Sequence, residues 1–305
     1  MLSIIVPARN NYDFTASCLG TILHSLTRLH LSAEFILIDD ASDPDERILD
    51  AFHHHSTNAV GHSCKIARSH RHQHYSGVFS IGLNMATRDV IFFISNDMLV
   101  TPSFLEALLL VSALSRDFGI VRGTSNYVDS HPEHEVKAPE GTETYQERQA
   151  FSESVFNANA CRYTEDRILS GDAVLIKRAL VERIGVLDLR FFGYFGDVDY
   201  GMRAHLAGFK LVCAKGAWLY HEGSGHVKRE IEKMAGATWD ARKAARKTLI
   251  DEAYQEFRKK WNIEHPPSFT NVRSFRYFEL ARANAGRVAL KYELPSSVSN
   301  DLEFF

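Results

Sequence analysis

Two carboxylates near the middle of the chain could do acid–base chemistry. Asp197 and Asp199 lie two residues apart, directly after the aromatic and glycine-rich segment of residues 191–196. Packed aromatic side chains would shield a carboxylate from water, which raises its pKa and suits it to act as a general base. The same pattern fits the N-terminus of a helix, with Asp197 as the cap and Asp199 in the first turn. The local residues alone favour this second interpretation, so the rest of the chain has to decide.

Further acidic and amide side chains come directly after apolar runs that have the character of buried strands. They are Asn10, Asp39, Asp40 and Asp97. In a parallel sheet, ligands bind beyond the carboxyl ends of the strands. Carboxylates at that edge can accept hydrogen bonds from a ribose or a base, and Asp97 is suited to hold a hard cation on a diphosphate. Asp39 and Asp40 could equally form an Asx turn or a helix cap with Ser42.

The elements that must position these residues alternate between strands and helices. The apolar pattern predicts strands over residues 2–7, 34–38, 64–68, 89–94, 118–121, 168–176 and 209–213. It predicts helices over residues 15–30, 44–60, 78–86, 101–115, 177–185, 199–207 and 228–261. The β-α-β order at the start implies a parallel sheet with right-handed crossovers. Residues 122–164 are polar and aperiodic, as in a functional loop, and the aromatic tail of residues 266–305 could wrap the domain or contact another copy.

Histidines are frequent in the first quarter of the chain, and three of them alternate. His70, His72 and His74 would share one face of a strand and could form a metal cluster. The same loop, which also contains arginine and glutamine, could instead contact phosphates. Because the preceding segment is also rich in histidine, the alternation alone gives little support to a metal site.

Composition limits the class of protein. The chain has 305 residues, 45% of them hydrophobic, which is enough for a substantial α/β core. Lysine and arginine number 35 against 38 aspartates and glutamates, which argues against a nucleic-acid binder. The four widely spaced cysteines fit a reducing compartment, and no secretory signal or membrane-spanning apolar run is evident. We therefore expect a cytoplasmic protein without a transmembrane segment, and leave open a peripheral association with the inner face of the membrane and a homo-oligomer.

Several motifs occur in an order that is more specific than any one of them. They are Ile4-Ile5-Val6-Pro7, Ile38-Asp39-Asp40-Ala41-Ser42, Phe93-Ile94-Ser95-Asn96-Asp97, Gly171-Asp172-Ala173, Gly185-Val186-Leu187-Asp188, Asp197-Val198-Asp199 with Arg203, Gly208-Phe209 and His221-Glu222-Gly223-Ser224. This series resembles the family 2 glycosyltransferases, inverting enzymes of the GT-A fold that use nucleotide-sugar donors. The resemblance covers about residues 2–226.

The resemblance implies an α/β fold, with a mostly parallel, Rossmann-like sheet flanked by helices. Residues 1–226 would form the GT-A glycosyltransferase domain, divided into a nucleotide-binding half (1–115) and an acceptor half (116–226). Residues 227–305 would form a C-terminal helical extension. The expected reaction moves a sugar from a nucleotide-diphosphate sugar, with UDP as the expected nucleotide, to a hydroxyl of a glycan or glycoconjugate.

The resemblance also assigns roles residue by residue. The nucleotide pocket would be lined by Pro7, Ala8, Arg9 and Asn10. Further donor contacts would come from Asp39, Asp40, Asn96 and Asp97. Asp97, together with His221, would coordinate a Mn²⁺ or Mg²⁺ ion on the donor diphosphate. Asp197 would be the catalytic base that takes the proton of the acceptor hydroxyl.

Two positions depart from the family's pattern. Ser95 replaces the first acid of the Asp-x-Asp motif, and Gly196 replaces the usual glutamate before the base, so acceptor handling is expected to be unusual. Asp172 and Asp199 are candidates for contacting the acceptor, although Asp199 could instead hold its helix through an ion pair. The departures keep an alternative open, a non-catalytic sugar- or partner-binding module that retains the fold. A nucleotidyltransferase is disfavoured because residues 8–11 contain no glycine.

Overall fold

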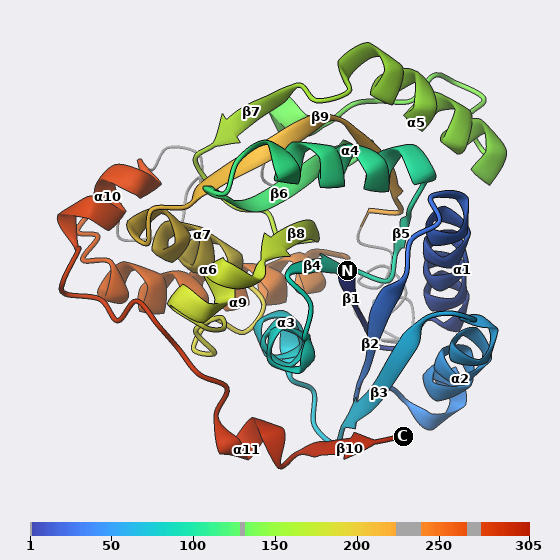
Figure 1. Ribbon diagram of the computed structural model, residues 1–305. Helices are drawn as coiled ribbons and strands as arrows, with labels where there is room; N and C mark the ends of the chain where they lie inside the picture. Colours follow the sequence, from blue (N-terminus) through green and yellow to red (C-terminus); the bar gives the residue numbers. More distant parts are fainter. Residues whose placement is uncertain (1, 129–131, 224–238, 267–275) are drawn as a thin grey trace.

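The computed structural model describes residues 2–128, 132–223, 239–266 and 276–305 and arranges them around one sheet, with helices on both faces (Figure 1). Within these ranges the sheet has ten strands in the order β10-β3-β2-β1-β4-β8-β6-β9-β5, and β7 pairs with β9. The strands are β1 (Leu2–Ala8), β2 (Ala33–Asp40), β3 (Ser63–Ser69), β4 (Val90–Ile94), β5 (Met98–Leu99), β6 (Phe118–Ser125), β7 (Tyr163–Asp166), β8 (Ala173–Lys177), β9 (Lys210–His221) and β10 (Leu302–Phe304). Among the described residues, no helix is both long and apolar enough to cross a membrane.

The helices divide between the two faces of the sheet. They are α1 (Tyr12–Arg28), α2 (Ile48–Asn58), α3 (His74–Met85), α4 (Pro102–Leu114), α5 (Tyr145–Asn159), α6 (Arg178–Ile184), α7 (Gly196–Leu206), α9 (Trp239–Lys260), α10 (Tyr277–Ala283) and α11 (Ser296–Ser299). Helices α1, α2 and α4 pack on one face, and α3, α6, α7 and α11 on the other. Two short 3₁₀ turns occupy residues 44–46 and 132–134.

The two faces are built by the alternation of side chains along each strand. In β1, Ile4 and Val6 belong to the core under α1, whereas Ile5 belongs to the core under α3. Strand β2 alternates in the same way, with Phe35 on the first face and Ile36 on the second. A strand that buries both faces has to be apolar throughout, which is why the short apolar runs predicted these strands correctly.

Strand pairing brings the predicted donor residues to one edge. Strand β1 lies parallel to β2 on one side and to β4 on the other. In this register Pro7 faces Ile38 and Ala8 faces Asp39, so the ends of β1 and β2 meet. The parallel part comprises β3, β2, β1 and β4, and antiparallel pairing with β8 joins it to the half that contains β6 and β9. The predicted parallel pairing therefore holds for β3, β2, β1 and β4, whereas the whole sheet is mixed, because β5, β7, β8 and β10 pair antiparallel with their neighbours.

A third core cluster fixes α7 against the C-terminal helices. Phe195 and Met202 of the α7 region pack with Tyr254, Phe257 and Trp261 of the α9 region. The last three side chains have no exposed surface. Truncating a fully buried aromatic side chain to alanine typically costs about 3–5 kcal/mol of stability. The apolar side chains of α9 therefore pack on the core although the helix is rich in charged residues.

The C-terminal segment returns to the far edge of the sheet. Strand β10 pairs antiparallel with β3, with Leu302 opposite Ser69 (Figure 1). Before reaching it, the chain passes Gly185, where the Val186 amide donates to the Tyr292 carbonyl at 3.0 Å. The predicted helical extension therefore also contains a strand of the main sheet. The predicted boundary between residues 226 and 227 lies outside the described residues, as does the start of the helix predicted from residue 228.

Several element boundaries differ from the predicted ones. The aperiodic segment of residues 122–164 contains helix α5, which begins at a capping box formed by Thr144 and Glu147. Helix α7 begins at Gly196 instead of residue 199, since the chain turns into it through Phe195, whose φ is 65°. Strand β9 continues to His221, well beyond the predicted end at residue 213, because its second half pairs with β6 and β5.

Candidate active site

Asp97 and His221 come from distant parts of the chain and lie side by side. Strand β5 pairs antiparallel with β9 so that Met98 faces His221. The Nε2 atom of His221 is 3.5 Å from Oδ2 of Asp97. Two hydrogen bonds with the side chain of Asn126 hold the backbone of His221, at 2.9 Å and 2.7 Å. Burial alone would lower the pKa of His221, but the carboxylates of Asp97 and Asp172 raise it above the ordinary value.

Asp172 continues this arrangement of charges on the other side of the imidazole ring. Its Oδ2 lies 3.7 Å from Nδ1 of His221, and its Oδ1 lies 3.7 Å from Nη2 of Arg122. Arg122 is almost fully buried, so the carboxylate balances a charge that would be costly to enclose alone. The Nδ1 atom also lies 3.3 Å from the carbonyl oxygen of Tyr127. The predicted acceptor residue Asp172 therefore also borders the predicted metal ligand His221.

Asp197 lies in the first turn of α7 and is partly buried. Its Oδ1 accepts a hydrogen bond from the Val198 amide at 2.8 Å, and its Oδ2 accepts one from the Gly171 amide at 3.3 Å. Burial raises the pKa of Asp197 to about 6, the two amides oppose this shift, and the nearby charge of Asp172 adds to it. The expected N-cap role is wrong, since Phe195 occupies the cap position. A carboxyl group with this pKa is largely ionised at neutral pH and can still accept a proton.

Two glycines allow the elements around Asp197 to approach closely. The Tyr75 hydroxyl donates to the Gly171 carbonyl at 3.0 Å. A Cβ atom on Gly171 would overlap with that hydroxyl and lie 3.2 Å from Cβ of Asp197. A Cβ atom on Gly196 would overlap with Oγ of Ser76, which itself donates to the carbonyl of Phe191. Packing of α7 against α3 thus explains why glycine, and no larger residue, precedes Asp197.

The segment between β4 and β5 positions Asp97. The Ser95 amide donates to the Asp172 carbonyl at 2.9 Å, and the Glu222 amide donates to the Asp97 carbonyl at 3.0 Å. Asn96 is buried, and its Nδ2 donates to Oγ1 of Thr15 in α1 at 2.9 Å. Asn96 therefore anchors the segment to α1, and its predicted donor contact stays a prediction.

Hydrogen bonds join the ends of β1 and β2 at the predicted nucleotide pocket. The Asn10 amide donates to Oγ of Ser42 at 2.8 Å. The Arg9 guanidinium donates to the carbonyl oxygens of Asp40 and Ala41 at 2.8 Å and 2.9 Å. Asn10 has a φ of 57°, in the left-handed region that asparagine tolerates better than most residues. Arg9 and Asn10 thus lie beside the acidic pair, and their contact with a nucleotide stays a prediction.

Asp39 forms the turn that was weighed as its alternative role. Its Oδ1 accepts a hydrogen bond from the Ser42 amide at 3.0 Å, and its Oδ2 lies 3.5 Å from Nε of Arg68. The side chain is almost fully buried. The carboxylate therefore stabilises the loop after β2, and its contact with a base or ribose stays a prediction.

Asp40 is tied to the loop of residues 70–73, which connects β3 to α3 and is called the β3–α3 loop below. The Gln73 amide donates to Oδ1 of Asp40 at 2.6 Å, and Nε2 of His72 is 3.3 Å from Oδ2. Burial raises the pKa of Asp40 to about 7, although the Gln73 hydrogen bond and the charge of Arg9 oppose the shift. Asp40 is thus close to half-ionised at neutral pH.

Asp199 is not available to an acceptor. Its carboxylate is fully buried and accepts hydrogen bonds from Nε of Arg203 at 2.8 Å and from Nε1 of Trp261 at 3.0 Å. The ammonium group of Lys260 lies 2.6 Å from the same carboxylate. The prediction of an acceptor contact is therefore wrong for Asp199, and the alternative prediction that it holds its helix is confirmed.

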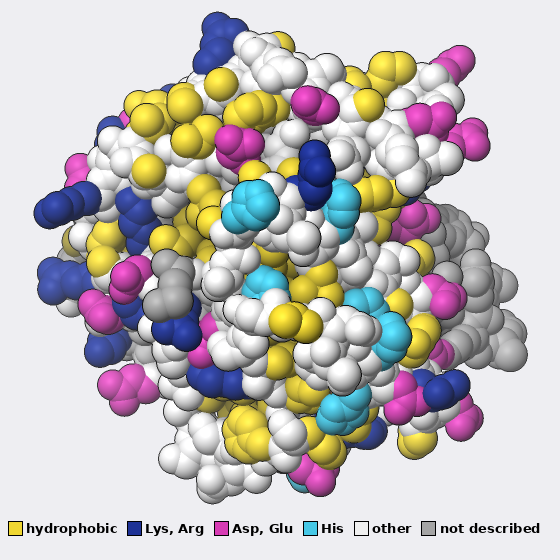
Figure 2. Space-filling view, turned by 45° about the vertical axis from the view of Figure 1, so that its right-hand side comes forward, with side chains coloured by type: hydrophobic (Ala, Val, Ile, Leu, Met, Phe, Trp, Pro, Cys, Tyr) yellow, Lys and Arg dark blue, Asp and Glu magenta, His cyan; other side chains and the backbone are white. Residues whose placement is uncertain are grey.

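The alternating histidines do not form a metal cluster. In the part of the chain that the structure describes, no three side chains of histidine, cysteine, aspartate or glutamate are arranged to hold a metal ion. The rings of His72 and His74 pack against each other at 3.9 Å between centroids, and His72 faces Asp40. Figure 2 shows histidine side chains scattered over one face of the molecule. A divalent ion at Asp97 and His221 would therefore need additional ligands from a bound substrate.

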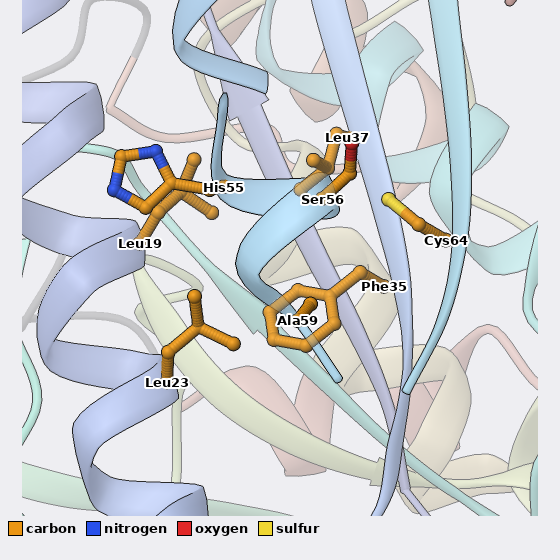
Figure 3. Close-up of a pocket in the computed structure, with 8 residues that line it drawn as sticks. All are labelled: Leu19, Leu23, Phe35, Leu37, His55, Ser56, Ala59 and Cys64. Atoms are coloured by element: carbon orange, nitrogen blue, oxygen red, sulfur yellow. The ribbon is translucent and has the colours of Figure 1, made fainter. Parts of the chain in front are cut away.

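An apolar cavity between α1, α2 and the sheet lies apart from these residues (Figure 3). Its volume is about 10 Å³, close to the smallest space that holds one water molecule. The lining residues are Leu19, Leu23, Phe35, Leu37, His55, Ser56, Ala59 and Cys64. The cavity is a packing gap and is too small for a substrate.

Comparison with solved structures identifies the fold. The chain is similar to the mannosyltransferase PcManGT from Pyrobaculum calidifontis in complex with GDP-Man and Mn²⁺, with a TM-score of 0.52, 14% identity, and coverage of 93% of this chain and 86% of that chain. It is also similar to GalNAc-T7 with UDP, GalNAc and Mn²⁺, with a TM-score of 0.57, 14% identity, and coverage of 92% of this chain and 55% of that chain. The fold is that of the GT-A glycosyltransferases, as predicted.

The family is shown by the sequence itself. A profile of glycosyl transferase family 2 matches residues 3–185, and the chain belongs to this family. No match was found among curated proteins. The predicted family is therefore confirmed, and family and fold together support a transferase.

Sequence reasoning missed four residues that shape the site. Tyr75 and Ser76 lie at the start of α3. Their hydroxyls donate to the carbonyl of Gly171, whose amide contacts Asp197, and to the carbonyl of Phe191, in the segment before α7. Arg122 balances Asp172, and Asn126 holds His221. Asn126 follows the last residue of β6, and Arg122 lies within the second half of that strand, which pairs in parallel with β9. Recognising that β6 is parallel to β9 would have pointed to them.

Proposed function

We propose that the protein transfers a sugar from a nucleotide-diphosphate sugar to a hydroxyl of a glycan or glycoconjugate by an inverting displacement. The observation that supports this most strongly is the continuous arrangement of Asp97, His221, Asp172 and Asp197 at one edge of the sheet. Neighbouring side chains in this series are linked at 3.5 Å and 3.7 Å, and the amide of Gly171, next to Asp172, donates to Asp197. The residues proposed to hold the metal and donor, Asp97 and His221, therefore lie next to the residues proposed to act on the acceptor, Asp172 and Asp197. These are called the metal end and the base end of the site below.

At the base end, the chain's own residues can move a proton. The raised pKa of Asp197, about 6, suits it to accept the proton of an attacking hydroxyl near neutral pH. Amide hydrogen bonds from Val198 and Gly171 fix the carboxylate in place before any substrate arrives. Arg122 lies next to Asp172, and its buried Nη1 has no hydrogen-bond partner among the described residues. We propose that Asp172 and Arg122 orient the acceptor or the transferred sugar.

At the other end, Asp97 and His221 would hold a divalent cation. A carboxylate oxygen suits Mg²⁺ or Mn²⁺, and the imidazole nitrogen makes Mn²⁺ the better match. When bound, such an ion stabilises the negative charge that develops on the nucleoside diphosphate. Arg9, Asn10, Asp39 and Asp40 would then contact the nucleotide. Both solved structures compared above contain a nucleotide or nucleotide-sugar and Mn²⁺, and UDP and GDP both remain candidates for this chain.

The transferase is tested by incubating the protein with UDP- and GDP-sugars and Mn²⁺ and measuring release of the nucleotide. Release that depends on Mn²⁺ and on added acceptor would support the proposal. Binding of nucleotide or sugar without release under any condition would favour the non-catalytic module instead. A cytoplasmic location stays a prediction, and a peripheral association with the inner face of the membrane stays open.

A further inference from the structure

The carboxylate of Asp301, close to the C-terminus, contacts three residues around the β3–α3 loop. It accepts hydrogen bonds from Oγ of Ser69 at 3.0 Å and from Nε2 of Gln73 at 2.8 Å. It also accepts from the backbone amide and Nε of Arg71, at 3.1 Å and 3.0 Å. The carbonyl oxygen of Asp301 accepts a further hydrogen bond from the amide of His70 at 3.1 Å. Asp301 thus contacts five donors of a segment more than 200 residues away in sequence, and it shares one of them, the Ser69 hydroxyl, with the carbonyl of Arg71.

The segment that presents Asp301 is itself firmly attached. Residues 296–304, called the C-terminal strap below, comprise α11 and β10. Val298 is buried in the core cluster under α3, and β10 pairs with β3 along Leu302, Glu303 and Phe304. The side chain of Asp301 is only 9% exposed, and its hydrogen bonds with Ser69 and Gln73 are partly buried, whereas those with Arg71 lie at the surface. The C-terminal strap is therefore a rigid segment to which the β3–α3 loop is attached.

The other side of the same loop contacts the proposed donor pocket. The Gln73 amide donates to Asp40 at 2.6 Å, while the Gln73 side chain donates to Asp301. Asp40 in turn lies at the end of β2, and its carbonyl accepts a hydrogen bond from Arg9. Gln73 thus connects the C-terminal strap with the carboxylate of Asp40. The family profile ends at residue 185, so Asp301 lies outside the matched region.

We propose that Asp301 is a positioning residue that fixes the β3–α3 loop in the conformation in which Asp40 receives a nucleotide-sugar donor. This proposal rests on the proposed function. A loop ordered before binding spares the ligand the entropic cost of ordering it. If the released loop occupies its present conformation about one tenth of the time, the apparent Kd for the nucleotide rises about tenfold.

The test uses the full chain with Asp301→Ala, with Asp301→Asn as the milder variant, and with Glu303→Ala as the control. Glu303 belongs to the same strap, is exposed, and has no side-chain hydrogen bond or ion pair among the described residues. Amide hydrogen exchange of residues 70–73 is measured together with the affinity for UDP and for GDP in Mn²⁺ by calorimetry. Asp301→Asn keeps the shape and one oxygen acceptor, so it carries the test if Asp301→Ala does not fold.

We expect faster exchange of the Arg71 and Gln73 amides and an affinity loss of roughly five- to tenfold in the Asp301 variants, with wild-type values for Glu303→Ala. Unchanged exchange would overturn the proposal. Faster exchange with unchanged nucleotide affinity would also overturn it, because the loop would then be ordered by Asp301 without affecting the pocket. If the wild-type protein binds neither nucleotide, the proposed function fails, and the exchange of the Gln73 amide alone decides whether Asp301 fixes the loop.

Discussion

Replacing Asp199 by asparagine would remove a buried carboxylate that both Arg203 and Lys260 contact. The two ion-pair distances are 2.8 Å and 2.6 Å, and the side chains of Asp199 and Arg203 have no exposed surface. Because Lys260 is the last residue of α9 and Arg203 belongs to α7, the carboxylate links the two helices. Asp199 also lies two residues from Asp197, so this network holds the base end of the proposed site.

The structure sets the size of the effect. Removing one partner of a buried ion pair typically costs about 3–5 kcal/mol, since the other charge stays enclosed. Here Arg203 keeps hydrogen bonds to the carbonyls of Ile184 and Val186, and Lys260 keeps its contact with Asp188 at 2.9 Å. We therefore expect Asp199→Asn to lower the free energy of unfolding by about 3 kcal/mol, near the lower limit. For a chain of 305 residues this corresponds to a fall in Tm of roughly 5 °C.

Chemical denaturation followed by tryptophan fluorescence measures this change, because Trp261 itself donates to Asp199. Glu182→Gln is the matched control, since Glu182 lies exposed on α6 and should change stability by less than about 0.5 kcal/mol. A free energy of unfolding for Asp199→Asn within about 0.5 kcal/mol of the wild-type value would refute the argument. Full stability combined with weaker acceptor binding would restore the acceptor role of Asp199.

Three further predictions concern the proposed site. Asp97→Ala should lower the Mn²⁺-dependent affinity for a nucleoside diphosphate by about tenfold or more, and calorimetry showing the same affinity would contradict the ligand role. Because Asp197 has a pKa of about 6, kcat/KM should fall about tenfold from its plateau to pH 5 as the base becomes protonated, whereas a profile flat to pH 4.5 would exclude it as the titrating base. Gly196→Ala should destabilise the protein by about 1–3 kcal/mol through overlap with Ser76, with part of the loss recovered in a Ser76→Ala background; additive losses in the double variant would show that the overlap is not the cause.

The sequence predicted the first half of the fold well because its elements are encoded locally. Strands that bury both faces must be apolar throughout, so β1, β2 and β4 were evident as short apolar runs. Helix α5 was missed although its capping box, Thr144 with Glu147, was visible, because its mostly polar surface lacks apolar periodicity. The start of α7 was displaced because an aromatic residue, Phe195, takes a left-handed φ that its type does not favour.

In the candidate site, too, some features could be predicted from the sequence and others depend on tertiary packing. The order of motifs predicted that Asp97 and His221 belong to one site, and the β5–β9 pairing places them 3.5 Å apart. Asp199 is kept from an acceptor by its contacts with Lys260 and Trp261. Tertiary packing brings these two side chains to Asp199, and no local sequence pattern predicts that contact. The contacts of Asp301 with the β3–α3 loop are of the same kind, because a short C-terminal strand and a polar loop share no sequence pattern.

The most direct test of the proposed mechanism is the turnover of Asp197→Asn measured beside its donor affinity. Asparagine keeps the size and one hydrogen-bond acceptor of the side chain but cannot take the acceptor's proton. We predict that turnover falls by about 10²–10⁴-fold, the usual contribution of a general base, while the Kd for the donor nucleotide in Mn²⁺ changes by less than about threefold. Turnover near the wild-type value would contradict the assignment of Asp197 as the base.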